Sequence, residues 1–95
     1  MIKDLKTGMN NVNLRAKVIE VSQPKQILTK FGTQTTLTIA TLQDNTGIIK
    51  ATLWGTQSDG VQEGTEIEIN KGFVKEFREE LQLSIGKGGA IKVVG

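Results

Sequence analysis

The chain has 95 residues, of which 37% are hydrophobic and 23% are charged, and its formal net charge is +2. This length and balance predict one globular domain with a modest core. Cysteine and histidine are both absent, which excludes disulfides, thiolate zinc sites and the commonest general base of enzymes. The small positive charge favours binding to a polyanion only if the cations gather on one face.

A long β-strand is predicted near the start of the chain. Residues 12–22 alternate apolar and polar side chains up to Val18, after which Ile19 and Val21 take the opposite phase. Such a change of phase predicts a bend or a bulge within the strand. Residues 34–42 are rich in β-branched side chains and predict a second strand.

Turns and connectors separate the remaining predicted strands. Residues 43–47, with the sequence QDNTG, predict a hairpin loop in which Gly47 takes a left-handed conformation. Residues 48–54 form the return strand, and the polar segment 55–64 is predicted to be a connector with at most one helical turn. Further short strands are predicted at residues 65–70, 81–85 and 90–94.

Two longer segments are predicted to be loops, namely residues 23–33 and the highly charged residues 74–80. Short strands separated by glycine turns favour a small closed barrel, because closure removes the edge strands. We therefore predict an all-β fold, a five-stranded Greek-key OB-fold barrel with little or no helix, that spans residues 1–95 as a single domain.

Trp54 has two interpretations. It falls on the outward phase of its strand together with Lys50 and Thr52, and large exposed apolar groups are typical of binding surfaces. Alternatively, Trp54 packs under a loop or plugs one end of the barrel.

The three phenylalanines also have two interpretations each, one structural and one as ligand contacts. Counting from the inward-facing Ile69 places Phe73 inside the barrel, unless a bulge at Lys71–Gly72 turns it outward. Phe77 and Phe31 lie in the predicted loops, where each ring either covers a barrel end or contacts a ligand.

Considered together, the four aromatic residues favour a nucleic-acid groove. Their segments flank one face of a five-stranded Greek-key barrel. Aromatic rings can stack on bases while cations between them contact phosphates. The interleaved cations are Lys25, Lys30, Lys50, Lys71, Lys75 and Arg78.

Three segments are distinctive: "IKDLKTGMNNVNLRAKVIEVSQPKQILTKFG", "LQDNTGIIKATLWG" and "VQEGTEIEINKGFVKEFREELQLSIGKGG". They resemble the single-OB-fold, single-stranded DNA-binding proteins of archaea. They are also similar to the related OB-fold subunit of the SOSS complex and to the DNA-binding domains of replication protein A. The resemblance implies that Trp54, Phe73 and Phe77 stack on bases, and that Lys25 and Ile27 contact the strand.

The chain departs from this family in three respects. Phe73 stands where a larger aromatic residue is common, and Phe31 is an additional ring. Relatives carry a Gly/Arg-rich or acidic tail, whereas this chain ends at Gly95, as either a tailless member or a trimmed domain.

The predicted groove contacts are Lys25, Ile27, Lys30, Phe31, Lys50, Thr52, Lys71, Lys75 and Arg78.

No catalytic set can be assembled from the sequence. The glycine-rich residues 86–89 lack the spacing and the Ser or Thr of a phosphate-binding loop, so they predict a turn into the last strand. The carboxylates have no histidine or nucleophile to pair with. We therefore predict a protein that is not an enzyme and needs neither a cofactor nor a metal.

The leading hypothesis is sequence-tolerant binding of single-stranded DNA during replication, recombination and repair. The protein is then expected to be a monomer in the cytoplasm, associated with the nucleoid and not with a membrane. Its expected protein partners are replication or repair proteins. Two alternatives stay open. The first is an OB domain for protein interaction, in which the rings dock a peptide. The second is an RNA-binding OB domain, because the 2′-hydroxyl is distinguished by fine geometry.

Overall fold

The computed structural model describes residues 2–55 and 60–94, with all their side chains except those of Phe77 and residues 86–88. Within these ranges a short 3-10 helix at Ile2–Asp4 precedes the strands, and no helix is long and apolar enough to cross a membrane. The strands are β1 (Val12–Val21), β2 (Lys25–Leu28), β3 (Gln34–Gln43), β4 (Ile48–Trp54), β5 (Glu66–Phe77) and β6 (Glu80–Val93).

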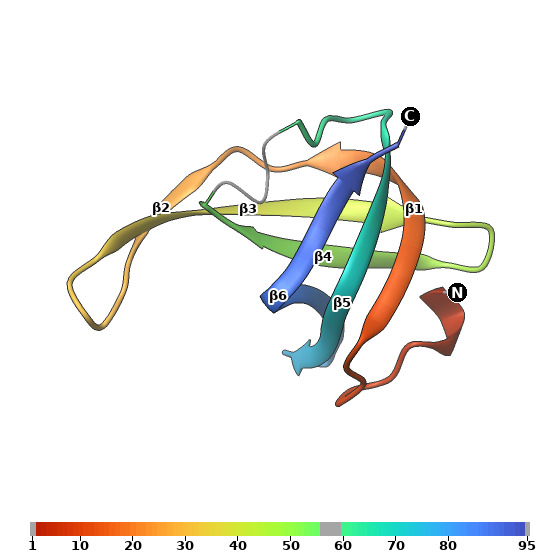
Figure 1. The fold of residues 1–95 in the computed structure, drawn as a ribbon, viewed down its shortest axis with the longest axis horizontal. Coiled ribbons are helices and arrows are strands. Elements are labelled where there is room, and N and C mark those ends of the chain that lie inside the picture. The colour runs from red at the N-terminus through yellow and green to blue at the C-terminus, as the bar shows by residue number, and fades with distance from the viewer. Residues whose placement is uncertain (1, 56–59, 95) are drawn as a thin grey trace.

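The strands form one sheet that closes on itself (Figure 1). Their order is β1-β5-β6-β4-β3-β2, and β1 also pairs with β3 to complete the ring. All pairs are antiparallel except β4–β6, which is parallel. The predicted all-β OB-fold barrel is therefore confirmed. The largest fully buried side chains in its interior are Leu42, Leu53, Ile67, Ile69, Leu83 and Val18.

β1 serves both halves of the barrel because it bends where the sequence changes phase. Its first part pairs with β5, and its last part pairs with β3. The register with β3 shifts between Val18 and Glu20. Ile19 is the extra residue there, so the predicted bulge is confirmed.

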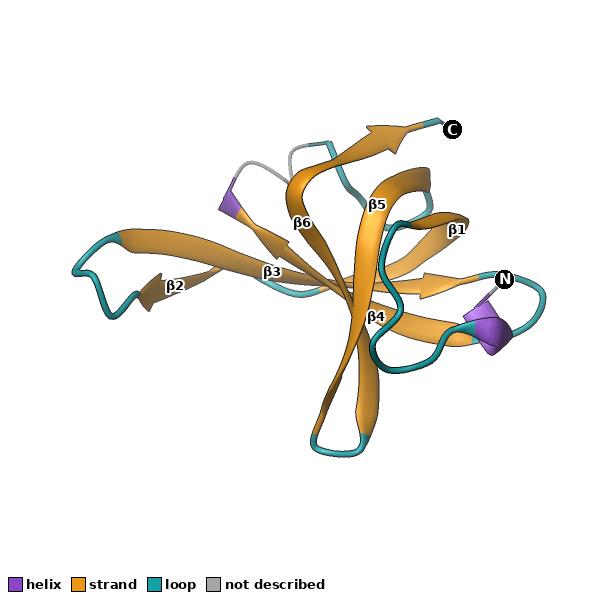
Figure 2. Ribbon diagram, turned by 60° about the horizontal axis from the view of Figure 1, so that its bottom comes forward, coloured by secondary structure: helices purple, strands orange, loops and turns teal. Residues whose placement is uncertain are grey.

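Two hairpins reach beyond the barrel, and both correct a prediction. Residues 23–33 were expected to be a loop, but Lys25–Leu28 pair with β3 as the strand β2. Residues 74–80 were also expected to be a loop, but β5 continues to Phe77 and the turn is confined to Arg78 and Glu79. Figure 2 shows the β2–β3 and β5–β6 hairpins extending in different directions from the barrel.

The β3–β4 turn is organised by a carboxylate and not by a left-handed glycine. Gly47 does not take a positive φ, so that prediction was wrong. Asp44 Oδ1 accepts hydrogen bonds from the backbone N–H groups of Thr46 (2.6 Å) and Gly47 (3.1 Å), and from the Thr46 hydroxyl. Its Oδ2 accepts the N–H of Ile2 at 2.9 Å, which ties the N-terminal segment to the turn.

This network makes the stability of the fold sensitive to acid. The hydrogen bond from the Thr46 side chain, helped by backbone donors, lowers the pKa of Asp44 from 3.8 to about 2. Because the folded-state pKa lies below the unfolded one, the contribution of Asp44 is complete above about pH 4 and is lost as the pH falls towards 2. We expect Asp44→Asn to be less stable than the wild type at neutral pH, and urea unfolding should show this difference shrinking between pH 5 and 2. A difference that stays constant over this range would contradict the assignment.

The glycine-rich residues 86–89 also differ from their prediction. They do not form a turn between two strands, since β6 runs continuously through them. Its pairing with β5 is instead interrupted: Ile85 lies opposite Gly72, and Ala90 lies opposite Asn70. The connector predicted at 55–64 includes residues 56–59, which lie outside the described residues.

Candidate nucleic-acid interface

A groove of about 320 Å³ lies on the outer face of the barrel over β3, β4, β5 and β6. Three apolar and three polar or charged side chains line it, namely Leu37, Ile39, Trp54, Thr52, Lys75 and Gln82. Their positions follow from strand register, which places outward residues of neighbouring strands about 5 Å apart. The groove lies between the two projecting hairpins.

Trp54 ends β4 and stands opposite Leu37 of β3 at one side of the groove. The alternation predicted for β4 holds for its inward side chains, since Ile49, Ala51 and Leu53 are buried. It fails for Thr52, which lines the groove but is only 6% exposed. Trp54 keeps 37% of its surface exposed. The ring is thus anchored on the sheet, with part of its surface still open to solvent.

Phe73 faces outward because a bulge precedes it. Lys71 has a φ of 58°, and the register between β5 and β6 shifts between Asn70 and Gly72. The extra residue reverses the alternation, so that Val74 is buried while Phe73 is 36% exposed. Of the two placements that the sequence left open, the structure shows the outward one, and inward placement by counting from Ile69 is wrong.

One row of side chains links the two rings. Phe73 lies opposite Ser84 of β6, and Ser84 lies beside Thr52 of β4. Trp54 follows Thr52 by two positions on the same strand. Standard strand spacings place Trp54 and Phe73 about 12 Å apart, which is far enough for the two rings to receive different bases.

A parallel row supplies cations. Lys75 of β5 lies opposite Gln82 of β6, which lies beside Lys50 of β4. Lys75 lines the groove directly. Lys50 Nζ lies 3.3 Å from a carboxylate oxygen of Glu80, in an exposed ion pair. A phosphate that contacts Lys50 therefore competes with that carboxylate for the ammonium group.

The β2–β3 hairpin carries four of the predicted contacts. Lys25 lies opposite Leu37, one strand further from Trp54, and the half-buried Ile27 lies opposite Thr35. Lys30 and Phe31 occupy the tip of the hairpin, where the Lys30 ammonium lies 5.4 Å from the centre of the Phe31 ring. Phe31 is 83% exposed, so the tip presents an exposed ring and a charge.

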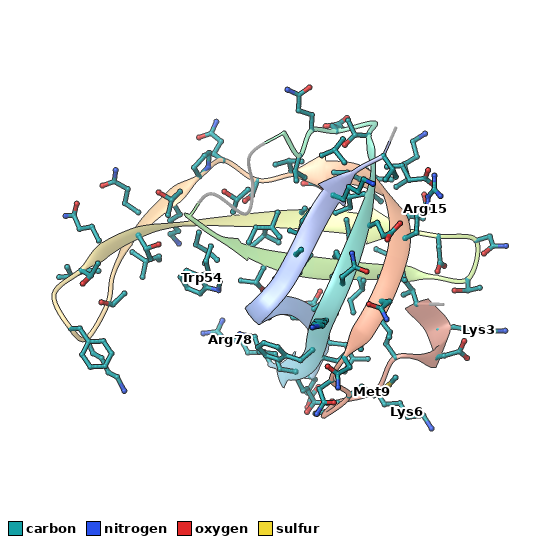
Figure 3. The ribbon with its side chains drawn as sticks, in the orientation of Figure 1. Lys3, Lys6, Met9, Arg15, Trp54 and Arg78 are labelled. Carbon is teal, nitrogen blue, oxygen red and sulfur yellow. The ribbon has the colours of Figure 1, made fainter. Side chains whose placement is uncertain are left out.

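Three predicted residues lie at the margin of the groove or away from it. Phe77 ends β5 opposite Glu80, but its side chain lies outside the described part of the structure. Figure 3 shows Arg78 and Trp54 on the same side of the molecule, with Arg15 on the other side. Lys71 does not line the groove; its N–H donates to Asn13 Oδ1 of β1 at 3.3 Å, which places its backbone beside β1.

Sequence reasoning missed Gln82, Leu37 and Ile39 as groove residues. Gln82 takes the outward phase in the alternating segment 81–85, so its position was available from the pattern. Leu37 and Ile39 could not be recognised because an apolar residue on a β-strand normally predicts the core. Here β3 directs Ala40 and Leu42 inward, and Leu37 and Ile39 lie on its other face among polar residues.

The chemistry available in the groove is that of binding. Aromatic and aliphatic surface, the Lys75 ammonium, a hydroxyl and an amide lie together there, and Lys50 lies beside Gln82 on the neighbouring strand. Among residues 2–55 and 60–94, no group of three or more acidic side chains is arranged to hold a metal ion.

Comparison with known proteins identifies the family. The model of the Ssb-like, OB-fold single-stranded DNA binding proteins matches residues 5–93. The single-stranded DNA binding protein Ssb of Saccharolobus solfataricus is 35% identical over 85 residues, which are 90% of this chain and 57% of that relative. The chain therefore spans little more than half the length of this relative.

Solved structures agree with the fold. The second OB-fold domain of replication protein A from Methanococcus maripaludis is 28% identical, with a TM-score of 0.82 over 99% of this chain and 92% of that one. The OB domain of a Thermoplasma acidophilum protein has the same TM-score at 22% identity, covering 98% of this chain and 83% of that one. The resemblance read from the sequence is confirmed, and the chain belongs to the Ssb-like family of single-stranded DNA-binding proteins with an OB fold.

Proposed function

We propose that this chain binds single-stranded DNA in the groove, with bases stacked on Trp54 and Phe73 and phosphates held by Lys75 and Lys50. The observation that carries the proposal is that the partly exposed Trp54 lines a groove together with Lys75, while the partly exposed Phe73 lies two residues from Lys75 on β5. Every base has a π-face, so stacking on such rings binds DNA without selecting a sequence.

The hairpins extend the same surface at both ends. Lys25, Ile27, Lys30 and Phe31 on the β2–β3 hairpin continue the path beyond Trp54. Phe77 and Arg78 on the β5–β6 hairpin continue it beyond Phe73, where Phe77 provides a third stacking ring. Lys71, at the bend of β5, adds a phosphate contact. We propose that the protein protects exposed single strands in this way during replication, recombination and repair.

Titration of the intrinsic fluorescence tests the proposal, because Trp54 is the only tryptophan. A base stacked on the indole should quench its emission. We expect single-stranded dT oligonucleotides to do so and duplex DNA of equal length to do so much more weakly. Matched RNA distinguishes the RNA-binding alternative. Unchanged emission at saturating oligonucleotide would remove Trp54 from the binding site.

Repeating the titration at several salt concentrations separates nucleic acid from a peptide ligand. Binding to single strands has a log–log slope of about −0.7 per neutralised phosphate, so the six candidate cations predict a slope of about −2 to −4. The Lys50–Glu80 ion pair keeps the slope moderate, because its carboxylate competes with phosphate for Lys50. A slope near zero would favour a docked peptide.

A further inference from the structure

We propose that Gln82 contacts the edge of a base in the groove and allows different bases to be accepted there. This inference rests on the proposed function and assigns a hydrogen-bonding role to a residue that stacking does not involve. Gln82 is half-buried in the floor of the groove beside Thr52. A base stacked on Trp54 would direct its edge towards these two side chains, since Trp54 and Thr52 are two positions apart on β4.

The amide suits a tolerant site because it carries both a donor and an acceptor. Its NH₂ group donates two hydrogen bonds and its carbonyl oxygen accepts two. The edges of unpaired bases also present donors and acceptors, which proteins read by hydrogen bonding. By rotating about its last bond, Gln82 can offer either group to the base.

Thr52 supports both orientations of the amide. Its hydroxyl lies 3.4 Å from Gln82 Oε1 and can either donate to the oxygen or accept from the nitrogen. This is the side-chain hydrogen bond described for Gln82 within residues 2–55 and 60–94, and the residue also lines the groove. A base that covers this half-buried amide displaces water from it, so the base must replace the lost hydrogen bonds for binding to be favourable.

The two lysines that flank Gln82 would hold a nucleotide by its phosphate, with its base close to the Gln82 side chain. Lys75 lies opposite Gln82 on β5, and Lys50 lies beside it on β4. Among the described residues that line the groove, none is an aspartate or a glutamate. A phosphate held by either lysine keeps the attached base close to Gln82, so the ligand is a nucleotide of a single strand.

Replacing Gln82 with glutamate should make the site select between bases, whereas the wild-type amide accepts different bases. A carboxylate only accepts hydrogen bonds. Cytosine presents an amino group that carboxylates accept from, whereas thymine places carbonyl oxygens on both sides of its single N–H. We expect the wild type to bind dC and dT oligonucleotides of equal length with similar affinity. The Gln82→Glu protein should prefer dC by about tenfold, in line with a hydrogen bond to a charged group.

Two further variants isolate the effect. Gln82→Leu keeps the approximate size but removes the hydrogen bonds, so its affinity for both oligonucleotides should fall by the same factor. Gln43→Glu makes the same chemical change at an exposed position of β3 outside the groove. It should leave the ratio of dC to dT affinity at the wild-type value. Thermal melts confirm that all three proteins are folded.

The outcomes distinguish the inference from the function on which it rests. If the wild type binds both oligonucleotides and Gln82→Glu leaves their affinity ratio unchanged, Gln82 does not contact a base. If the wild type binds neither oligonucleotide, the proposed function itself is wrong.

Discussion

Replacing Trp54 with alanine should weaken single-strand binding by about 1–3 kcal/mol, which corresponds to roughly fivefold to 150-fold in the dissociation constant. The variant loses the stacking surface that closes one side of the groove. Anisotropy of a labelled dT oligonucleotide measures the change, since the variant has no tryptophan to report it. The affinity of Trp54→Phe for the oligonucleotide should lie between those of the wild type and Trp54→Ala, because this variant keeps a smaller ring.

The fold should survive this substitution. Trp54 packs on the outside of the barrel and keeps 37% of its surface exposed, so its removal leaves no internal cavity. A modestly lower melting temperature is expected from the lost contact with Leu37. Ile48→Ala is a matched control, because Ile48 is an exposed apolar residue of β4 that does not line the groove. Equal affinity of the Trp54→Ala and Ile48→Ala proteins would contradict the assignment.

Replacing Gly89 with alanine should destabilise the protein by about 1–3 kcal/mol or more, the usual range for overpacking. A Cβ at this position would lie 3.0 Å from the carbonyl oxygen of Asn70 and 3.1 Å from that of Lys71. It would also lie 2.9 Å from Ile85 Cγ2. The two carbonyl groups belong to the β5 bulge and cannot move away as a flexible side chain could.

Thermal and urea unfolding measure this effect. We expect the melting temperature to fall by about 4–8 °C for each kcal/mol lost. Gly47→Ala is the control, since its added Cβ would meet Ile2 at an ordinary contact distance of 3.4 Å. Single-strand binding well below the melting temperature should weaken as well, because displacement of the bulge moves Phe73. Equal melting temperatures for the two variants would show that Gly89 is not closely packed against the bulge.

The barrel could be predicted because its strands each bury one face. Alternation then marks the core, and a change of phase marks a bulge. The bulge of β1 was visible as the phase change at Ile19. The bulge at Lys71 was only an option, because Phe73 and Val74 are adjacent apolar residues and the sequence alone does not decide which of them faces the core.

The projecting hairpins could not be predicted because alternation depends on a buried face. Residues 74–77 extend β5 to the end of the β5–β6 hairpin, where Lys75 and Glu76 are exposed, so their high charge suggested a loop. The two-residue turn at Arg78 and Glu79 gave no signal either. Both residues have a positive φ, of 52° and 66°, as in a type I′ turn, for which Asn and Gly are the usual residues.

The ring closure of the barrel also determines how the chain must fold. The pairs β2–β3, β3–β4 and β5–β6 are hairpins between consecutive strands, so their ends meet early. By contrast, β1–β3 pairing skips β2, and β4–β6 pairing is parallel and skips β5. The β1–β5 pairing joins residues that are 49 to 60 positions apart in the sequence. The entropy of closing these loops is lost before the contacts form. Refolding should therefore take milliseconds to seconds, as in other barrels with distant pairings, and the hairpins that border the groove should form before the barrel that carries it.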